Sequence, residues 1–417
     1  MPIRILHFAD AHIDMLNRGK HDPESGLPVR VMDFLRSLDV IVNTAIEERV
    51  DLVLFAGDAF KDRSPAPTFI REWGRRIMRL SRAGIPTVLL VGNHDLSPAA
   101  HRAHALDPFE TFAVPHVQVV DEPKLLTPAD LDGLALQIVA LPWVSRSGLL
   151  AFLGEEQTNL SLREIYDRIG ELLTRGVQKL LSQADPRLPL VLTAHASVQG
   201  ARYGAERLVM LGNDLVLPAS LVKDPRWAYV ALGHIHKKQN LNEGSQPPVI
   251  YPGSIERVDF GEADEDKFFV IATLEPAQPT QVDWRKLPVR QVIDKSWTAR
   301  NPLNITQEAI AALGPAEGLK DAIVRLTLTY PQEQTAHLDE AALYAHAAQA
   351  LEFHLVKRPQ SKSRSRLGDE RVESLTHLEL LEKYFLAKGV DGEARTALLA
   401  LARDILEPAA EDEARPQ

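Results

Sequence analysis

Runs of apolar residues recur along the first 275 positions, and stretches with helical periodicity separate them. Each run predicts a strand, at residues 3–8, 52–57, 87–92, 136–141, 189–195, 228–234 and 268–274. Several runs are apolar throughout, which is typical of strands covered on both faces. Apolar positions at residues 31–47 and 69–81 instead follow the period of a helix. The pattern therefore predicts a layered α/β domain.

The pattern changes after this region. Residues 275–279 are rich in Pro, Gln and Thr and predict a linker. Residues 321–330 alternate apolar and polar positions like a half-buried strand, and the alanine-rich residues 338–353 predict a helix. A second, smaller β/α module of roughly 80 residues fits these signals. Residues 357–366 are basic and Ser-rich, so we expect them to be mobile.

Two helical segments are expected near the end of the chain. Thr376 and Glu379 form a capping-box pattern for the first, and Gly389 marks its stop. A second amphipathic stretch runs to about Leu406. With the preceding signals, this predicts domains at residues 1–278, 279–360 and 361–417.

Composition narrows the class of protein. The 417-residue chain has no cysteine, which excludes disulfides, thiolate nucleophiles and cysteine-based zinc sites. Its net charge of -10 argues against a nonspecific nucleic-acid coat protein, although local basic patches remain possible. No apolar run approaches the roughly 18 residues of a membrane span, and the first residues lack a signal-peptide pattern. We expect a cytoplasmic protein.

Polar side chains follow five of the predicted strands, at the point where each strand ends. They are Asp10 and His12; Asp58; Asn93, His94 and Asp95; His195; and His234 and His236. In open α/β sheets, ligands bind outside the carboxyl ends of the strands. The sequence therefore brings His, Asp and Asn side chains to one edge.

Each fragment alone has an ordinary structural explanation. An aspartate after a strand usually begins a turn or caps a helix, and Asn93 after a glycine fits a turn. A lone histidine at a strand end is more often a hydrogen-bonded surface or core residue than a ligand. The argument for a site rests on all five fragments occurring together.

The residue types indicate a metal site. Imidazoles, carboxylates and an amide oxygen without thiolates favour Mn, Fe or Zn. Seven such groups are too many for one ion with open positions, whereas two ions sharing a carboxylate would use them. A pair of ions about 3.5–4 Å apart supports in-line displacement at phosphorus.

These motifs resemble those of the calcineurin-like metallophosphoesterases. Asp-x-His, Gly-Asp, Gly-Asn-His-Asp, a lone His and Gly-His-x-His occur in the family's order between residues 3 and 257. Residues 194–208, 232–239 and 251–262 are more narrowly similar to the SbcD-type nuclease subunits, the bacterial counterparts of the archaeal and eukaryotic double-strand-break repair nucleases. The resemblance implies a layered β-sandwich flanked by helices, a smaller α/β capping domain and a C-terminal helical tail.

The resemblance also implies residue roles. Asp10, His12, Asp58 and His236 would hold one ion, and Asp58, Asn93, His195 and His234 the other, with Asp58 bridging. Manganese is the family's usual ion. His94 would protonate the leaving oxygen or steady the charge at phosphorus, and Asp95 would support that loop or form only a turn.

The chain departs from many relatives three residues after the bridging aspartate. Lys61 stands where they carry Asp or His, and Arg63 follows it. Either cation would contact a phosphate of the substrate, or the segment is only a solvated turn.

Basic residues elsewhere are candidate DNA contacts. Arg71, Arg75 and Arg79 share a face of a predicted helix by i,i+4 spacing, which also fits a solvated face. The second candidate is the segment 357–366, with Lys357, Arg358, Lys362, Arg364 and Arg366.

The resemblance implies a DNA phosphodiesterase of an SbcCD-like complex, with double-strand 3′-5′ exonuclease and single-strand endonuclease activity in DNA repair, recombination and replication. No Gly-rich phosphate loop ending in Gly-Lys-Ser/Thr occurs, so the chain should not hydrolyse ATP by a P-loop mechanism. The resemblance implies a separate SbcC-type coiled-coil ATPase. Residues 375–406 would dock on it or pack on the chain's own core. The family also forms homodimers through the nuclease domain. The alternatives are a calcineurin-like phosphatase or phosphodiesterase for a non-DNA phosphoester, and a scaffold without activity.

Overall fold

The structure is a computed structural model that describes residues 2–15, 19–96, 102–144, 162–204, 216–301, 303–360 and 376–406. Backbone proximity divides the chain into two compact units. The first comprises Met1–Lys295, Pro315–Arg325 and Ala347–His354, and the second comprises Ser296–Gly314, Leu326–His346 and Leu355–Gln417. The boundaries expected from sequence at residues 278 and 360 stay predictions.

The first sheet holds six strands of the described chain. In spatial order they are β14 (Gln281–Lys286), β13 (Phe268–Leu274), β1 (Ile3–Phe8), β2 (Leu52–Phe55), β3 (Thr87–Leu90) and β4 (Val117–Val120). Strands β1 to β4 are parallel, while β13 runs antiparallel to β1 and β14 antiparallel to β13. The carboxyl ends of β1, β2 and β3 therefore meet at one edge.

The second sheet also has six described strands. Their order is β11 (Gln239–Asn240), β12 (Val249–Tyr251), β10 (Tyr229–Gly233), β7 (Leu190–His195), β6 (Gln137–Leu141) and β5 (Lys124–Leu126). Strands β6, β7, β10 and β12 are parallel. A short parallel pair, β8 (Ser197–Val198) and β9 (Val216–Leu217), follows β7.

The two sheets pack face to face. Side chains of both sheets form one buried cluster, with Leu54 and Val88 from the first sheet and Ile138 and Val191 from the second. Because these strands are covered on both faces, their residues are apolar at successive positions rather than alternating. The layered β-sandwich expected from the resemblance is confirmed.

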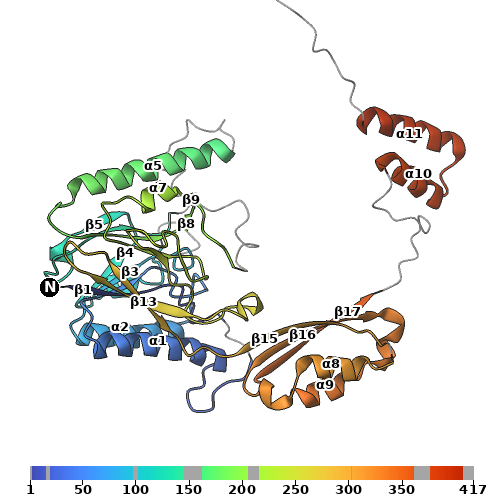
Figure 1. Cartoon of the computed structure of the whole chain (residues 1–417), viewed down its shortest axis with the longest axis horizontal. Coiled ribbons are helices and arrows are strands. Elements are labelled where there is room, and N and C mark those ends of the chain that lie inside the picture. Colours follow the sequence, from blue (N-terminus) through green and yellow to red (C-terminus); the bar gives the residue numbers. More distant parts are fainter. Residues whose placement is uncertain are drawn as a thin grey trace, which may run out of the picture. The chain divides into compact units, whose positions relative to one another are not determined.

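Helices cover the outer faces of this sandwich (Figure 1). On the first sheet, α1 (Val29–Glu47) and α2 (Pro67–Arg82) pack their apolar faces, and Trp73 lies against Phe55 with ring centroids 4.9 Å apart. On the second sheet lie α5 (Leu162–Gln183) and α7 (Ala219–Val222). The chain also forms α3 (Asp107–Thr111) and the short 3-10 helices η1 (Pro128–Asp130) and η3 (Phe260–Glu262).

A three-stranded sheet follows, in the order β15 (Val292–Thr298), β16 (Ile323–Pro331) and β17 (Glu352–Gln360). Its neighbours in sequence are α8 (Ile305–Leu313), η4 (Ala316–Leu319), η5 (Gln332–His337) and α9 (Glu340–His346). Within the second unit, α8 and α9 pack together, and Ile305, Leu328 and Leu343 are buried. The smaller α/β module expected from the sequence is thus present.

The last described elements are α10 (His377–Ala387) and α11 (Gly392–Leu406), which pack against each other. The capping box is confirmed, because Thr376 Oγ1 accepts the backbone N–H of Glu379 at 3.3 Å while the Glu379 carboxylate accepts the N–H of Thr376 at 2.7 Å. Gly389 follows the helix with φ +68°.

Three sequence expectations were wrong in detail. Residues 275–279 form the loop between the antiparallel strands β13 and β14, not a linker. The helix expected over residues 338–353 ends at His346, because the backbone N–H of Leu351 donates to Ala322 O and β17 begins at Glu352. Residues 357–360 belong to β17 rather than to a mobile segment, and residues 361–366, with Lys362, Arg364 and Arg366, lie outside the described residues.

None of the helices in the described ranges combines the length and apolar character needed to cross a bilayer.

Candidate metal centre

The predicted ligands gather where the carboxyl ends of both sheets meet. Asp10 and His12 follow β1, Asp58 follows β2 and Asn93 follows β3, while His195 and His234 end or follow β7 and β10. Backbone hydrogen bonds lock the first two loops together, with Asp10 N donating to Gly57 O at 2.9 Å and Ala11 N to Asp58 O at 2.8 Å. The loops are therefore a fixed frame for the side chains.

The backbone of this frame is unusual. Asp10 (φ 52°), His12 (φ 38°), Asp58 (φ 66°) and His234 (φ 96°) all lie in the left-handed region. Residues with a Cβ rarely adopt this conformation, and where they do the surrounding structure must hold them there. Four of the seven predicted ligands have this strained backbone conformation. The surrounding fold therefore holds them in it, and this sets the directions of their side chains.

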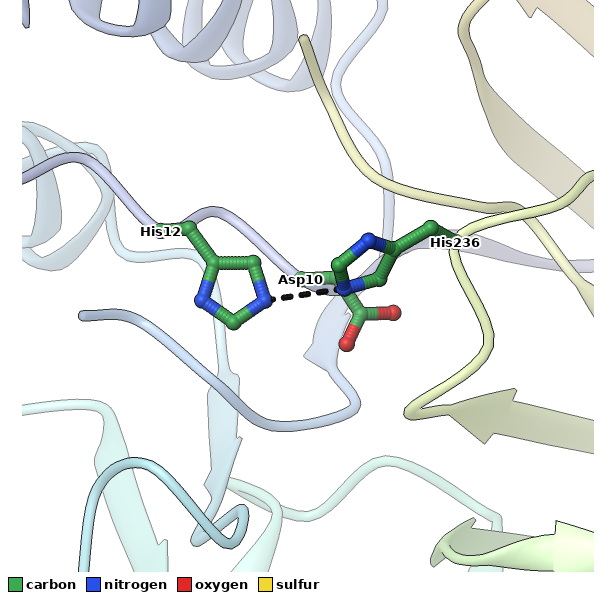
Figure 2. A group of neighbouring side chains, drawn as sticks. All are labelled: Asp10, His12 and His236. Carbon is green, nitrogen blue, oxygen red and sulfur yellow. Dashed lines mark hydrogen bonds between the residues drawn. The ribbon is translucent and has the colours of Figure 1, made fainter. Parts of the chain in front are cut away.

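One group of ligand atoms comes from Asp10, His12 and His236, which approach one another within 4.8 Å (Figure 2). His12 Nε2 lies 3.1 Å from His236 Nε2. The other ring nitrogens are held from outside the group. His12 Nδ1 lies 3.3 Å from the carbonyl oxygen of Phe60, and His236 Nδ1 lies 3.1 Å from Glu262 Oε1.

These outer contacts decide which nitrogen is available for a metal. A carbonyl or a carboxylate oxygen accepts, so each Nδ1 must carry a hydrogen and each neutral Nε2 presents a lone pair. Two lone pairs 3.1 Å apart repel unless a proton or a cation lies between them. Burial lowers the pKa of His12 well below its usual value, against the opposing effect of Asp58, so a proton is disfavoured there. A divalent cation fits this arrangement.

A second group comprises Asp10, Asp58 and His195, again within 4.8 Å of one another. His195 Nδ1 donates to Ala56 O at 2.7 Å, which turns its Nε2 toward Asp58 Oδ2 at 3.4 Å and Asn93 Oδ1 at 3.0 Å. Asn93 Oδ1 also lies 3.0 Å from His234 Nδ1. Nitrogen and oxygen donors thus converge here as well.

Two carboxylates reach both groups. Asp10 contributes an atom to each, whereas the resemblance gives the shared position to Asp58. Asp58 Oδ2 lies 3.8 Å from His12 Nε2 and 3.4 Å from His195 Nε2, so it also spans the two groups. Asp10 is further fixed by the N–H of His234, which lies 3.0 and 3.1 Å from its two oxygens.

Buried charges dominate the electrostatics. Although burial opposes ionisation, the nearby His195 lowers the pKa of Asp58. In return, Asp58 outweighs the burial of His195 and raises the pKa of that imidazole to about 9. Burial raises the pKa of Asp10, with His195 acting in the opposite sense. Such carboxylates need a positive partner, which a divalent ion supplies in place of protons.

Asp95 lies behind these ligands and is fully buried. Its Oδ2 accepts the backbone N–H of Asp58 and of Gly92, and its Oδ1 accepts that of Ala59, all at 2.9 Å. Burial and the charge of Asp58 raise the pKa of Asp95 to about 7. Asp95 therefore ties the loops after β2 and β3 together and acts as a positioning residue.

His94 is fixed at the mouth of the centre. Its backbone N–H donates to Asp58 Oδ1 at 2.9 Å, and its Nδ1 donates to Lys61 O at 2.7 Å. Its Nε2 is therefore the ring nitrogen that this contact leaves available. His94 lines an open pocket of about 480 Å³ together with Asp14, Lys61 and Arg63.

Glycines allow the close approach of the loops. A Cβ on Gly92 would collide with the Oδ1 and backbone N of Asp58, and one on Gly233 would collide with Ala56 O. Any larger residue would displace the carboxylate or the backbone beside it.

Several supporting residues were missed by the sequence reasoning. Glu262 holds His236 Nδ1 and pairs with the buried Lys267, whose Nζ lies 2.8 Å from its Oε2. Asp14 accepts the N–H of Lys61 at 2.6 Å, and the Trp143 ring lies 4.8 Å from that of His234. Glu262 stands in the stretch 251–262 that resembles the SbcD-type subunits, which was the available signal.

The arginines of α2 form ion pairs with nearby carboxylates. Arg71 and Arg75 contact Glu72 at 3.0 and 2.9 Å, and Arg79 contacts Asp39 at 2.9 Å. These pairs neutralise part of the helix's positive charge. A DNA-binding role of this face stays a prediction, as does that of Lys61 and Arg63, which are exposed.

Comparisons with known proteins agree with the site. A family model described as calcineurin-like phosphoesterase matches residues 3–238. The SbcD component of the nuclease SbcCD from Escherichia coli strain K12 is 26% identical over 296 residues, which cover 69% of each chain. The SbcD component from Bacillus subtilis is 27% identical over 68% of this chain and 69% of its own.

A more distant relative is archaeal. The DNA double-strand break repair protein Mre11 of Archaeoglobus fulgidus is 25% identical over 268 residues, which cover 63% of this chain and 52% of that protein. The resemblance first seen in the strand-end motifs is therefore confirmed.

Proposed function

Because the chain belongs to the calcineurin-like phosphoesterase family, we propose that it is a metal-dependent DNA phosphodiesterase, the nuclease subunit of an SbcCD-like complex. The observation that carries the proposal is the convergence of ligand atoms at one edge of the sandwich, with the lone pairs of His12 and His236 turned toward each other. We take DNA as the substrate because the relatives are described as a nuclease subunit and a DNA double-strand break repair protein.

The set of donor atoms fits two divalent ions, and we propose that both are manganese. Asp10, His12, Asp58 and His236 would hold one ion, and Asp58, Asn93, His195 and His234 the other. When bound, the ions supply a nucleophile at neutral pH and neutralise charge on the phosphoryl group.

The chain's own residues complete the chemistry. His94 holds one proton at Nδ1 against Lys61 O, so its Nε2 delivers a second proton to the leaving oxygen. Asp95 keeps the loops of Asp58 and His94 in register through its three backbone contacts.

Lys61 and Arg63 line the pocket beside His94 and would contact substrate phosphates. The arginines 71, 75 and 79 of α2 would add a weaker, partly neutralised contact farther along the duplex.

A coiled-coil ATPase of the SbcC type is the proposed partner. The tail helices α10 and α11 leave Tyr384, Leu386, Leu398 and Leu401 exposed, although they pack against each other. An amphipathic pair of this kind suits docking on a partner's apolar groove. Within that complex we propose double-strand 3′-5′ exonuclease and single-strand endonuclease activity, homodimerisation through the nuclease domain, and a cytoplasmic, nucleoid-associated role in DNA repair, recombination and replication.

The test uses the purified full chain, Mn²⁺ and end-labelled single- and double-stranded DNA, with and without the ATPase partner. We expect cleavage that Asp58→Ala abolishes, since this removes a ligand of both ions. Asp283→Ala, which changes an exposed carboxylate on β14, is the matched control and should cleave normally. Turnover of a generic phosphodiester without any cleavage of DNA would instead indicate a non-DNA substrate.

A further inference from the structure

A basic pocket lies beside the metal centre and is used by none of the roles described so far. It has a volume of about 610 Å³, and its lining includes Arg202, Lys223, Lys237 and Lys238, with Glu243 as the single carboxylate among the lining residues that the structure describes. The chain as a whole has a net charge of -10, whereas the lining of this pocket is positively charged. We propose that the pocket binds backbone phosphates of the DNA strand that leads away from the scissile bond.

The pocket is joined to the centre through two loops. Lys237 and Lys238 directly follow the predicted ligand His236, and Arg202 lies in the loop that leaves His195. Their cations are therefore carried by the same strand ends, β10 and β7, that present two histidines to the metals. We therefore expect a strand bound at the centre to continue past this pocket.

One side chain fixes the two loops to each other. Gln239 Oε1 accepts the backbone N–H of Arg202 at 2.8 Å, while Gln239 Nε2 donates to Arg202 O at 2.9 Å and to Lys237 O at 3.1 Å. Because the Gln239 amide holds the loop of Arg202 against the loop of Lys237, the fold fixes the distance between the backbones that carry these two cations.

The cations differ in their local partners. Lys238 Nζ lies 3.6 Å from the ring centroid of Phe268 and 4.5 Å from that of Trp284, so aromatic faces hold it in place. Lys237, which is exposed, lies 3.5 Å from the half-buried Glu265, so the pair is weak. Arg202 and Lys223 are exposed, and no carboxylate of the described residues lies within ion-pair distance of either.

A phosphodiester backbone suits this arrangement better than an acidic peptide or a free nucleotide would. The positive groups line an open pocket along the course of a bound strand. Contacts of this kind position nucleic acid without reading its sequence, and binding through them falls steeply with salt. The arginines of α2, in contrast, already lie on Glu72 and Asp39.

The test is the double variant Arg202→Gln/Lys223→Gln of the full chain. Both side chains are exposed and their backbones keep their contacts, so the fold should be unaffected, as its far-UV circular dichroism and melting temperature will report. Binding of a labelled single-stranded oligonucleotide with cleavage-resistant phosphorothioate linkages is followed by fluorescence anisotropy in Mn²⁺ over a range of KCl, so that the result does not depend on cleavage. We expect roughly tenfold weaker binding, and a slope of log Kd against log salt that falls by about 1.4 for two lost phosphate contacts.

Arg187→Gln/Arg226→Gln is the matched control. It removes the same charge from exposed arginines that lie just before β7 and β10, at the opposite ends of the same strands, and that are paired with Asp185 and Asp224. We expect its salt slope to equal that of the wild type. An equal loss in both variants would show an effect of net charge only and would overturn the proposal, as would an unchanged slope in the pocket variant.

The inference rests on the proposed function, and the two fail differently. A wild-type chain that binds and cuts DNA, with a pocket variant that binds equally well, refutes the pocket alone. A wild-type chain that neither binds nor cuts DNA refutes DNA as the substrate, and the pocket with it.

Discussion

Removal of the Asp95 carboxylate tests how the metal-binding loops are held. Asp95 accepts three backbone N–H groups, from Asp58, Ala59 and Gly92, each at 2.9 Å in a fully buried setting. Replacement by alanine leaves all three donors without an acceptor. At a net value of about 1 kcal/mol for each hydrogen bond, the local opening free energy should fall by roughly 3 kcal/mol. Replacement by asparagine keeps one oxygen and places an amide donor against a backbone donor, so a loss of about 1–3 kcal/mol is expected.

Backbone amide exchange measured by mass spectrometry on the full chain reports this loss directly, because the affected amides are themselves the probes. Asp95→Ala should exchange roughly 100-fold faster in peptides spanning residues 55–60 and 88–93, since each 1.4 kcal/mol is tenfold. Asp95→Asn should lie between alanine and the wild type. Asp283→Asn, an exposed carboxylate paired with Arg285, should leave these peptides unchanged. Unchanged exchange in Asp95→Ala would refute the view that this carboxylate holds the two loops.

Three further predictions concern residues around the same centre. His94→Ala should keep Mn²⁺ binding in calorimetry but lower the DNA cleavage rate about 10²–10⁴-fold, because it removes only a proton donor; loss of the metal together with activity would place His94 among the ligands instead. Glu262→Gln should weaken Mn²⁺ affinity about 10–100-fold and lower the melting temperature, since it loosens the histidine it holds and removes the nearer charged partner of the buried Lys267, leaving Glu265 at 3.4 Å. Adding Lys267→Met should restore the melting temperature but not the affinity; full restoration of both would contradict the orienting role. Gly92→Ala should abolish Mn²⁺ binding because its Cβ would collide with the Asp58 carboxylate. The control Gly170→Ala, with open space around its position on α5, should stabilise the chain slightly. Normal metal binding by Gly92→Ala would show that the loop can shift.

The central strands and the centre were predictable from sequence for the same reason. Strands β1 and β13 have the predicted limits, because burial on both faces favours apolar residues at most of their positions. Parallel neighbours then bring their carboxyl ends together, which is why Asp10, Asp58 and Asn93 could be grouped before any coordinates.

Edge strands were missed because their sequences carry no such run. Strand β17, EFHLVKRPQ, is mostly exposed and charged, and its pairing in the three-stranded sheet overrides its local pattern. The Glu262–Lys267 pair was missed for a different reason. It lies beside His236 only through tertiary contacts. The resemblance of residues 251–262 includes Glu262, but one sequence does not show which imidazole this carboxylate faces.

The ligands come from both sheets of the sandwich, so the centre lies at the junction of the two sheets. Asp10 and His234 belong to segments 224 residues apart, and the backbone N–H of His234 donates to the Asp10 carboxylate at this edge. Ions bound there would join the two sheets and hold the strand ends against the mutual repulsion of buried carboxylates. Because a ligand that binds only the folded state stabilises it by about 2.7 kcal/mol at a hundred times its dissociation constant, the folded population would depend on the metal supply. Metal starvation would then lower the amount of the protein in the cell as well as the activity of each molecule.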